Sequence, residues 1–135
     1  MALIEWNQSL SVAIKQFDDQ HQQLVAMVNQ LHQAIKEGQG SDTLHLILAG
    51  LVQYTQSHFA AEEALMEQYD YPEYPRHKQA HADLVRQVEE ISVQLEKGNR
   101  LQQINVMQFL VNWLTNHIKG EDKRYTAFFQ SKGVV

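Results

Sequence analysis

The sequence predicts an all-α protein, an up-down-up-down antiparallel four-helix bundle with an N-terminal arm and a short C-terminal helix. Four long segments repeat apolar residues in the three- and four-residue steps of an amphipathic helix. Short stretches that contain glycine or proline separate these segments, and helices with short connections pack antiparallel to their neighbours. A chain of 135 residues is the usual size of one domain, so residues 1–135 are expected to form a single bundle.

The elements follow in order along the chain. Residues 1 to about 16 are expected to form an irregular arm that packs on the bundle. Helices are predicted over about residues 18–37, 42–69, 75–97 and 101–119, with a short final helix over 121–130. Glycine ends the first and third of these helices, at Gly38 and at Gly98–Asn99. Pro72 and Pro75 separate the second helix from the third, because each proline disfavours helix at the residue before it.

The composition excludes several classes of protein. Hydrophobic residues make up 44% and charged residues 20% of the chain, as in ordinary globular proteins. A formal net charge of −5 argues against a nucleic-acid partner, which usually requires a basic surface. No secretory signal and no apolar run of about 18 residues is present, so a cytoplasmic location without membrane insertion is expected. Because the chain has no cysteine, any metal must be held by nitrogen and oxygen ligands.

Polar residues interrupt the apolar face of every predicted helix. In the second helix, His58 and Glu62 lie four residues apart and therefore share the inward face. A buried carboxylate is nearly always paired or bound to metal, because burial of an unpaired charge is costly. Inward positions of the four helices together carry His21, His58, Glu62, His77, His81 and His117.

Asp122 is the seventh candidate, although it follows His117 by five residues. A regular α-helix places residues at that spacing about 140° apart. Asp122 can join the cluster only if the helix is deformed or ends between the two residues, and Gly120 permits such a deformation. Glu63 points off the inward face and is expected to be a surface carboxylate or to lie beside the cluster.

A metal site explains this cluster better than a hydrogen-bond network. Single histidines such as His32 and His45 are expected to be surface or partly buried residues. Five histidines from four helices would need more hydrogen-bond acceptors than Glu62, Asp122 and Thr55 offer. Seven ligands are too many for one zinc ion, and imidazole does not suit calcium or magnesium. Iron, manganese, cobalt, copper or zinc remain, and seven ligands indicate two ions. Two six-coordinate ions that share one oxo or hydroxo bridge would leave one position open.

The chain closely resembles the hemerythrins, in particular the single-domain bacterial hemerythrins, in the order Asp18-x-Gln20-His21, His58-Phe59-x-x-Glu62-Glu63, His77-x-x-x-His81 and His117-x-x-x-x-Asp122. The resemblance covers essentially the whole chain and implies a non-haem di-iron centre that binds O₂ reversibly. It implies that Glu62, Asp122 and an oxo or hydroxo group bridge the two Fe ions. It also implies that His77, His81 and His117 hold the saturated iron, whereas His21 and His58 hold the iron with the open position.

An apolar oxygen pocket is expected beside the open iron, formed by Leu24, Phe59, Trp113, Leu114 and Ile118. A dry pocket would exclude water and slow the loss of the bound ligand. On family analogy alone, Tyr125 and Trp6 are expected to lie beside the ligands. The Glu-x-x-His pairs of carboxylate-rich di-iron oxygenases and ferritins do not occur in the sequence.

The leading hypothesis is therefore an oxygen-binding protein for storage, transport or sensing, and not an enzyme. A di-iron oxidase, a peroxidase or a nitric-oxide-handling enzyme is the first alternative, and a regulatory oxygen or iron sensor is the second. O₂ is the expected ligand, and nitric oxide or small anions could occupy the same position. Any oxygen-consuming protein partner is unknown.

Overall fold

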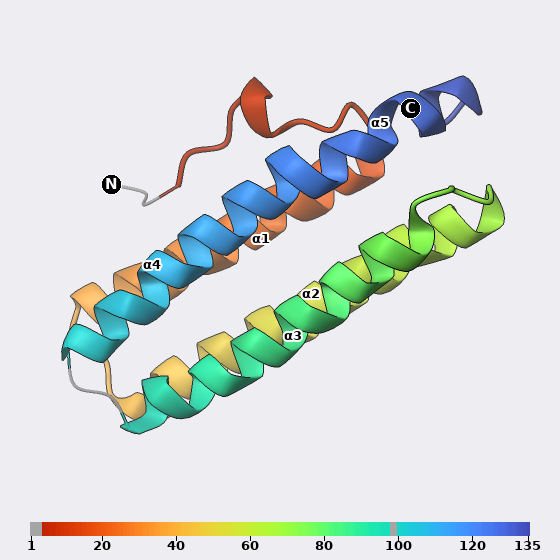
Figure 1. The fold of residues 1–135 in the computed structure, drawn as a ribbon. Coiled ribbons are helices and arrows are strands. Elements are labelled where there is room, and N and C mark those ends of the chain that lie inside the picture. Colours follow the sequence, from red (N-terminus) through yellow and green to blue (C-terminus); the bar gives the residue numbers. More distant parts are fainter. Residues whose placement is uncertain (1–3, 98–99) are drawn as a thin grey trace.

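Four long helices form the bundle that the sequence predicts (Figure 1). The structure, a computed structural model, describes residues 4–97 and 100–135. Its helices are α1 (Lys15–Lys36), α2 (Ser41–Gln68), α3 (Tyr74–Lys97), α4 (Arg100–Asn116), the π-helical η2 (His117–Asp122) and α5 (Lys123–Ser131). A short 3-10 turn, η1 (Gln8–Leu10), lies in the N-terminal arm. The predicted helix end at Gly98–Asn99 lies outside the described residues.

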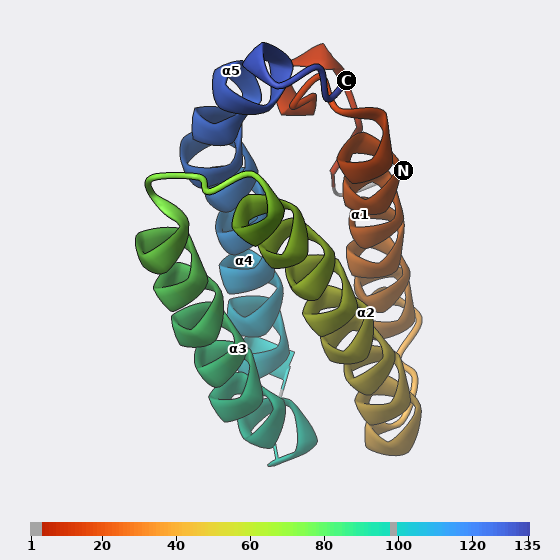
Figure 2. The same ribbon diagram turned by 90° about the vertical axis from the view of Figure 1, so that its right-hand side faces the viewer.

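The helices close into a ring. Each of α1, α2 and α3 packs against the next helix, and α4 packs back against α1. Figures 1 and 2 show α1 beside α4 and α2 beside α3, with α5 continuing the line of α4 at the end where the arm crosses it. Buried apolar side chains from all four helices fill the centre. This arrangement directs one face of every helix toward a common interior, where the candidate site lies. No helix in the described part of the chain is long and apolar enough to cross a membrane.

The arm packs on the bundle through side chains and through hydrogen bonds. Its residues Leu10, Val12 and Ile14 are buried. The side-chain amide of Asn29 on α1 accepts from the Ile4 N–H at 2.9 Å and donates to the Ile4 carbonyl at 2.8 Å. The expected irregular arm is therefore largely ordered against α1.

The first helix begins at Lys15, three residues before the predicted start. Asp18 is therefore not the residue at which α1 begins. Its own N–H donates to the Ile14 carbonyl at 2.8 Å, so Asp18 is already inside the first turn. Its carboxylate instead accepts from the Ser11 hydroxyl at 2.6 Å and from the Val12 N–H at 2.8 Å. The predicted start of this helix was wrong because the sequence pattern could not show that the Asp18 carboxylate binds Ser11 and Val12 of the arm.

Candidate metal centre

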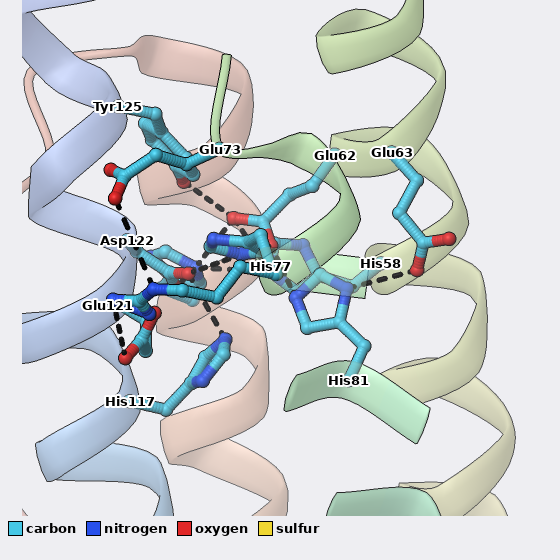
Figure 3. Close-up of polar contacts among 12 residues, drawn as sticks. His58, Glu62, Glu63, Glu73, His77, His81, His117, Glu121, Asp122 and Tyr125 are labelled. Carbon is cyan, nitrogen blue, oxygen red and sulfur yellow. Dashed lines mark hydrogen bonds and ion pairs between the residues drawn. The ribbon is translucent and has the colours of Figure 1, made fainter. Parts of the chain in front are cut away.

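Four elements bring the seven predicted residues into one buried cluster. His21 comes from α1, His58 and Glu62 from α2, His77 and His81 from α3, and His117 and Asp122 from η2. The seven residues are at most 7% exposed, and His21, Glu62 and Asp122 are fully buried. Figure 3 shows the side chains of His77, His81 and His117 turned toward Glu62 and Asp122.

A widened helical turn aligns Asp122 with His117. The segment His117–Asp122 is π-helical, so its hydrogen bonds span five residues and the turn holds one residue more than an α-turn. The predicted deformation is therefore present, but Gly120 is not what permits it. Gly120 does not adopt a positive φ, and a Cβ atom added there would meet nothing within 4 Å. The helix also continues through this segment into α5, where the sequence predicted an interruption.

The two carboxylates divide the histidines into two groups. Glu62 Oε1 lies 3.2 Å from His81 Nε2 and 3.6 Å from His77 Nε2. Asp122 Oδ1 lies 3.0 Å from His117 Nε2 and 3.2 Å from His77 Nε2. These atoms form one potential ligand set, with five residues.

The second oxygen of each carboxylate faces the other two histidines. Glu62 Oε2 lies 3.5 Å from His58 Nε2 and 3.6 Å from His21 Nε2, and Asp122 Oδ2 lies 3.1 Å from His21 Nε2. The Nε2 atoms of His21 and His58 are 3.0 Å apart. This second potential ligand set has four residues and shares Glu62 and Asp122 with the first.

Several of these inward atoms are buried without a hydrogen bond. They are Nε2 of His77, His81 and His117, Oε1 of Glu62, and both carboxylate oxygens of Asp122. A buried polar atom without a partner is costly, and native proteins rarely leave several of them in one place. Metal ions would supply the missing partners, and imidazole nitrogen with carboxylate oxygen is a donor set suited to iron. The residues present therefore fit a metal centre.

Outer contacts hold the ligand candidates in place. Gln20 Oε1 lies 2.5 Å from His58 Nδ1, and Glu63 Oε2 lies 2.9 Å from His81 Nδ1. The Tyr125 hydroxyl donates to Glu62 Oε2, and Tyr125 is completely buried. Sequence reasoning anticipated Tyr125 beside the cluster but did not assign partners to Gln20 or Glu63. Gln20 precedes His21 and Glu63 follows Glu62 in the sequence, and this adjacency was the available signal. Consecutive residues of a helix are rotated by about 100°, so the neighbour of an inward-facing residue can reach the adjacent helix.

The electrostatics of the metal-free cluster favour charged groups. Burial lowers the pKa of His21 and of His77, but the nearby carboxylates of Asp122 and Glu62 outweigh burial and raise each pKa to about 9. Burial raises the pKa of Glu62, yet the histidines around it hold that pKa well below its usual range. The pKa of Asp122 is likewise lowered, against the effects of burial and of the Glu62 charge, chiefly by His117. Burial and the Glu62 charge raise the pKa of Tyr125, which therefore remains a hydrogen-bond donor.

All five predicted pocket residues, Leu24, Phe59, Trp113, Leu114 and Ile118, are buried. The Phe59 ring stacks on His81, with centroids 3.7 Å apart and planes within 3°, and lies farther from His58, at 5.9 Å. Phe59 therefore covers the three-histidine group more closely than the two-histidine group, beside which it was expected. Trp113 lines a small apolar cavity of about 10 Å³ between α2, α3 and α4. Trp6 packs at the edge of the core, as a partly buried residue of the arm.

The fold and the cluster together define a four-helix-bundle protein with a histidine- and carboxylate-rich metal site. Comparison with known proteins gives the family. The model of the hemerythrin HHE cation binding domain matches residues 12–129, and the chain belongs to the hemerythrin family. Membership of this family implies a non-haem iron site and binding of O₂.

Individual relatives are similar along most of their length. The chain is 35% identical to a bacteriohemerythrin of Stenotrophomonas maltophilia over 93% of this chain and 80% of that protein. It is 36% identical to a bacteriohemerythrin of Pseudomonas aeruginosa over the same shares of the two chains. The crystal structure of a wild-type hemerythrin superimposes with a TM-score of 0.82 at 28% identity, over 93% of this chain and 97% of that one.

Proposed function

We propose that this protein binds dioxygen reversibly at a non-haem di-iron centre held by His21, His58, Glu62, His77, His81, His117 and Asp122. The observation that carries the proposal is the division of donor atoms around two shared carboxylates. One oxygen of each carboxylate faces histidines of the group His77, His81 and His117, and the other oxygen faces the group His21 and His58. This is the arrangement that two bridged metal ions require.

The unequal sets would make the two ions chemically different. His77, His81 and His117 with the two carboxylates offer five protein ligands to one iron, whereas His21 and His58 with the same carboxylates offer four to the other. A single oxo or hydroxo bridge between the ions would add one ligand to each. The set of His21 and His58 would leave room for an external ligand, and an iron pair held by these residues would supply the two electrons that reversible O₂ binding needs.

The protein residues around the centre favour retention of the ligand over turnover. Leu24, Leu114 and Ile118 are buried apolar residues that would exclude water from the exchangeable position. The buried Tyr125 hydroxyl donates to Glu62 and would help to hold its carboxylate in place as a bridge. These features fit storage or delivery of oxygen, and the protein is proposed to be a binding protein without an enzymatic reaction of its own.

Anaerobic reconstitution with Fe(II) tests the proposal. We expect about two iron ions per chain, and a visible absorption band that develops on exposure to air and disappears on deoxygenation. A protein that takes up two irons but never shows the reversible band would contradict oxygen binding. Steady consumption of peroxide or nitric oxide far above that of free iron would favour an enzyme instead.

Variants of the cluster test the ligand assignment. His77→Ala and Glu62→Ala are expected to abolish di-iron loading, because each removes a donor that the structure places among the buried inward atoms. His45→Ala is the control, since His45 lies on the exposed side of α2 and should leave the iron content unchanged. Iron content measured by mass spectrometry or a chromogenic assay would distinguish these outcomes. Equal iron content in all three variants would refute the assignment.

A further inference from the structure

His81 differs from His58 and His21 in what holds its outward nitrogen, Nδ1. His81 Nδ1 donates to the carboxylate of Glu63 at 2.9 Å, a contact visible in Figure 3. His58 Nδ1 instead faces the side-chain oxygen of Gln20, which is a neutral amide, at 2.5 Å. His21 Nδ1 is buried and has no hydrogen-bond partner. A negatively charged acceptor is therefore placed on the three-histidine side, and a neutral acceptor on the two-histidine side.

The position of His81 is tightly determined. Its Nε2 atom points into the cluster, 3.2 Å from Glu62 Oε1, while Nδ1 is fixed by Glu63. The Phe59 ring lies flat against the imidazole, with centroids 3.7 Å apart. Because one ring face is covered and Nδ1 is hydrogen-bonded, replacing the charge on Glu63 while keeping its shape should change the electronic character of His81 and not its orientation.

A carboxylate acceptor increases the electron donation of a metal-bound imidazole. The partner of the outer N–H draws that proton away from the ring, which raises the basicity of the ligand nitrogen. A more basic ligand favours the ferric over the ferrous state. The side chain of Glu63 is 21% exposed, so solvent weakens this effect without removing it.

We propose that Glu63 is a positioning residue that makes the three-histidine metal ion the more easily oxidised of the two, through the His81 Nδ1–H···Glu63 hydrogen bond. Gln20 gives His58 the same orientation without the charge. The two outer contacts thereby build an electronic asymmetry into the centre, in addition to the difference in ligand number. This inference rests on the proposed di-iron function.

The isosteric variant Glu63→Gln tests the charge, because glutamine can accept the same hydrogen bond. Metal-free protein would first be titrated with Co(II), a measurement that involves no oxygen chemistry. We expect the affinity of Glu63→Gln to fall about tenfold, the lower end of the effect of such outer contacts. The matched control is Glu67→Gln, an exposed glutamate one turn farther along α2, which should bind Co(II) like the natural protein.

The reduction potential of the iron-loaded protein is the second measurement. Glu63→Gln should raise the potential, and a tenfold change in the ratio of ferric to ferrous affinity corresponds to about 59 mV for one electron. Gln20→Glu should lower it, since it places a carboxylate on His58. This second variant keeps the inference testable if Glu63→Gln folds poorly.

The measurements on Glu63 and the test of oxygen binding distinguish failure of this inference from failure of the proposed function. Equal Co(II) affinities and potentials in Glu63→Gln and the natural protein would show that Glu63 only orients His81, and would overturn the inference. A loss of affinity in Glu63→Ala but not in Glu63→Gln would overturn it too, because only the hydrogen bond would then matter. Failure of the natural protein to bind two irons or to show the reversible oxygen band would refute the proposed function independently, since the Co(II) comparison needs neither.

Discussion

Glu62 and Asp122 organise the site at the level of single residues. Each is fully buried, and each uses both carboxylate oxygens toward different histidines. Burial alone would keep these groups neutral, but the surrounding imidazoles reverse that tendency and lower both pKa values. The same two side chains would therefore supply negative charge to the proposed pair of metal ions.

Leu114 is expected to protect the centre from water. Leu114→Ala removes part of a side chain that is 3% exposed, and we expect the protein to keep its iron but to autoxidise faster because water can enter. The control is Leu44→Ala, a fully buried leucine near the start of α2, away from the cluster. Both variants should lose about 2–5 kcal/mol of stability by leaving a cavity. Equal autoxidation rates in the two variants, followed by absorption spectroscopy, would contradict a specific role for Leu114.

At the level of elements, the N-terminal arm connects the start of α1 with α5. The Asp18 carboxylate holds Ser11 and Val12, and the Val12 carbonyl accepts from the Thr126 hydroxyl of α5 at 2.8 Å. Thr126 follows Tyr125, whose hydroxyl holds Glu62. Ala13, within this connection, has a φ of +59°, which is an unfavourable conformation for a residue with a Cβ atom. The arm therefore supports the site through α5.

Removal of the Asp18 carboxylate tests this connection. Asp18→Ala leaves the Val12 N–H and the Ser11 hydroxyl without their acceptor, and we expect a loss of about 1–3 kcal/mol in the free energy of unfolding. Asp19→Ala is the matched control, because Asp19 pairs with the exposed Lys15 and should change stability by less than about 1 kcal/mol. Urea unfolding of the metal-free proteins would measure both. Similar losses in the two variants would show that the arm contributes little.

At the level of the whole molecule, the bundle encloses a cluster of ionisable groups that would be costly without compensation. Five histidines and two carboxylates occupy the interior of a protein whose remaining core is mostly apolar. In the metal-free protein the opposite charges compensate one another. Metal ions would take the place of the histidine protons, so metal binding should release protons.

The stability of the metal-free protein should consequently depend on pH. The pKa values of His21 and His77 are raised to about 9, so their contribution is complete below the unfolded value near 6.5 and is lost as the pH rises through about 9. The lowered pKa values of Glu62 and Asp122 have the opposite effect, because their contribution is lost on acidification. We expect the free energy of unfolding to be greatest at about pH 5–6.5.

Denaturant unfolding at a series of pH values would measure this dependence. Iron-loaded protein is the comparison, since bound metal replaces the histidine protons and should remove the decline between pH 6.5 and 9. A metal-free protein that became more stable over that range would contradict the assigned charge states.

Much of the fold and of the cluster could be predicted from the sequence, because both depend on helical periodicity. The positions of His58 and Glu62, and of His77 and His81, follow directly from the four-residue repeat. Contacts between helices could not be obtained in this way. The partners of Gln20 and Glu63 depend on how α1 and α3 pack against α2, and the early start of α1 depends on an arm without periodicity.

The π-helical turn η2 limits how many residues the chain can have between His117 and Asp122. A π-turn can be regarded as an α-turn with one inserted residue. The number of residues in the turn therefore decides which way the side chains of the following helix, α5, point. Deletion of Gly120 would leave the four-residue interval that His58 and Glu62 already use, so the aspartate and Tyr125 should still face inward and iron should still bind. Insertion of a further residue there should rotate both away and abolish iron binding. The number of residues in this turn, more than the identity of any one of them, decides whether the centre can form.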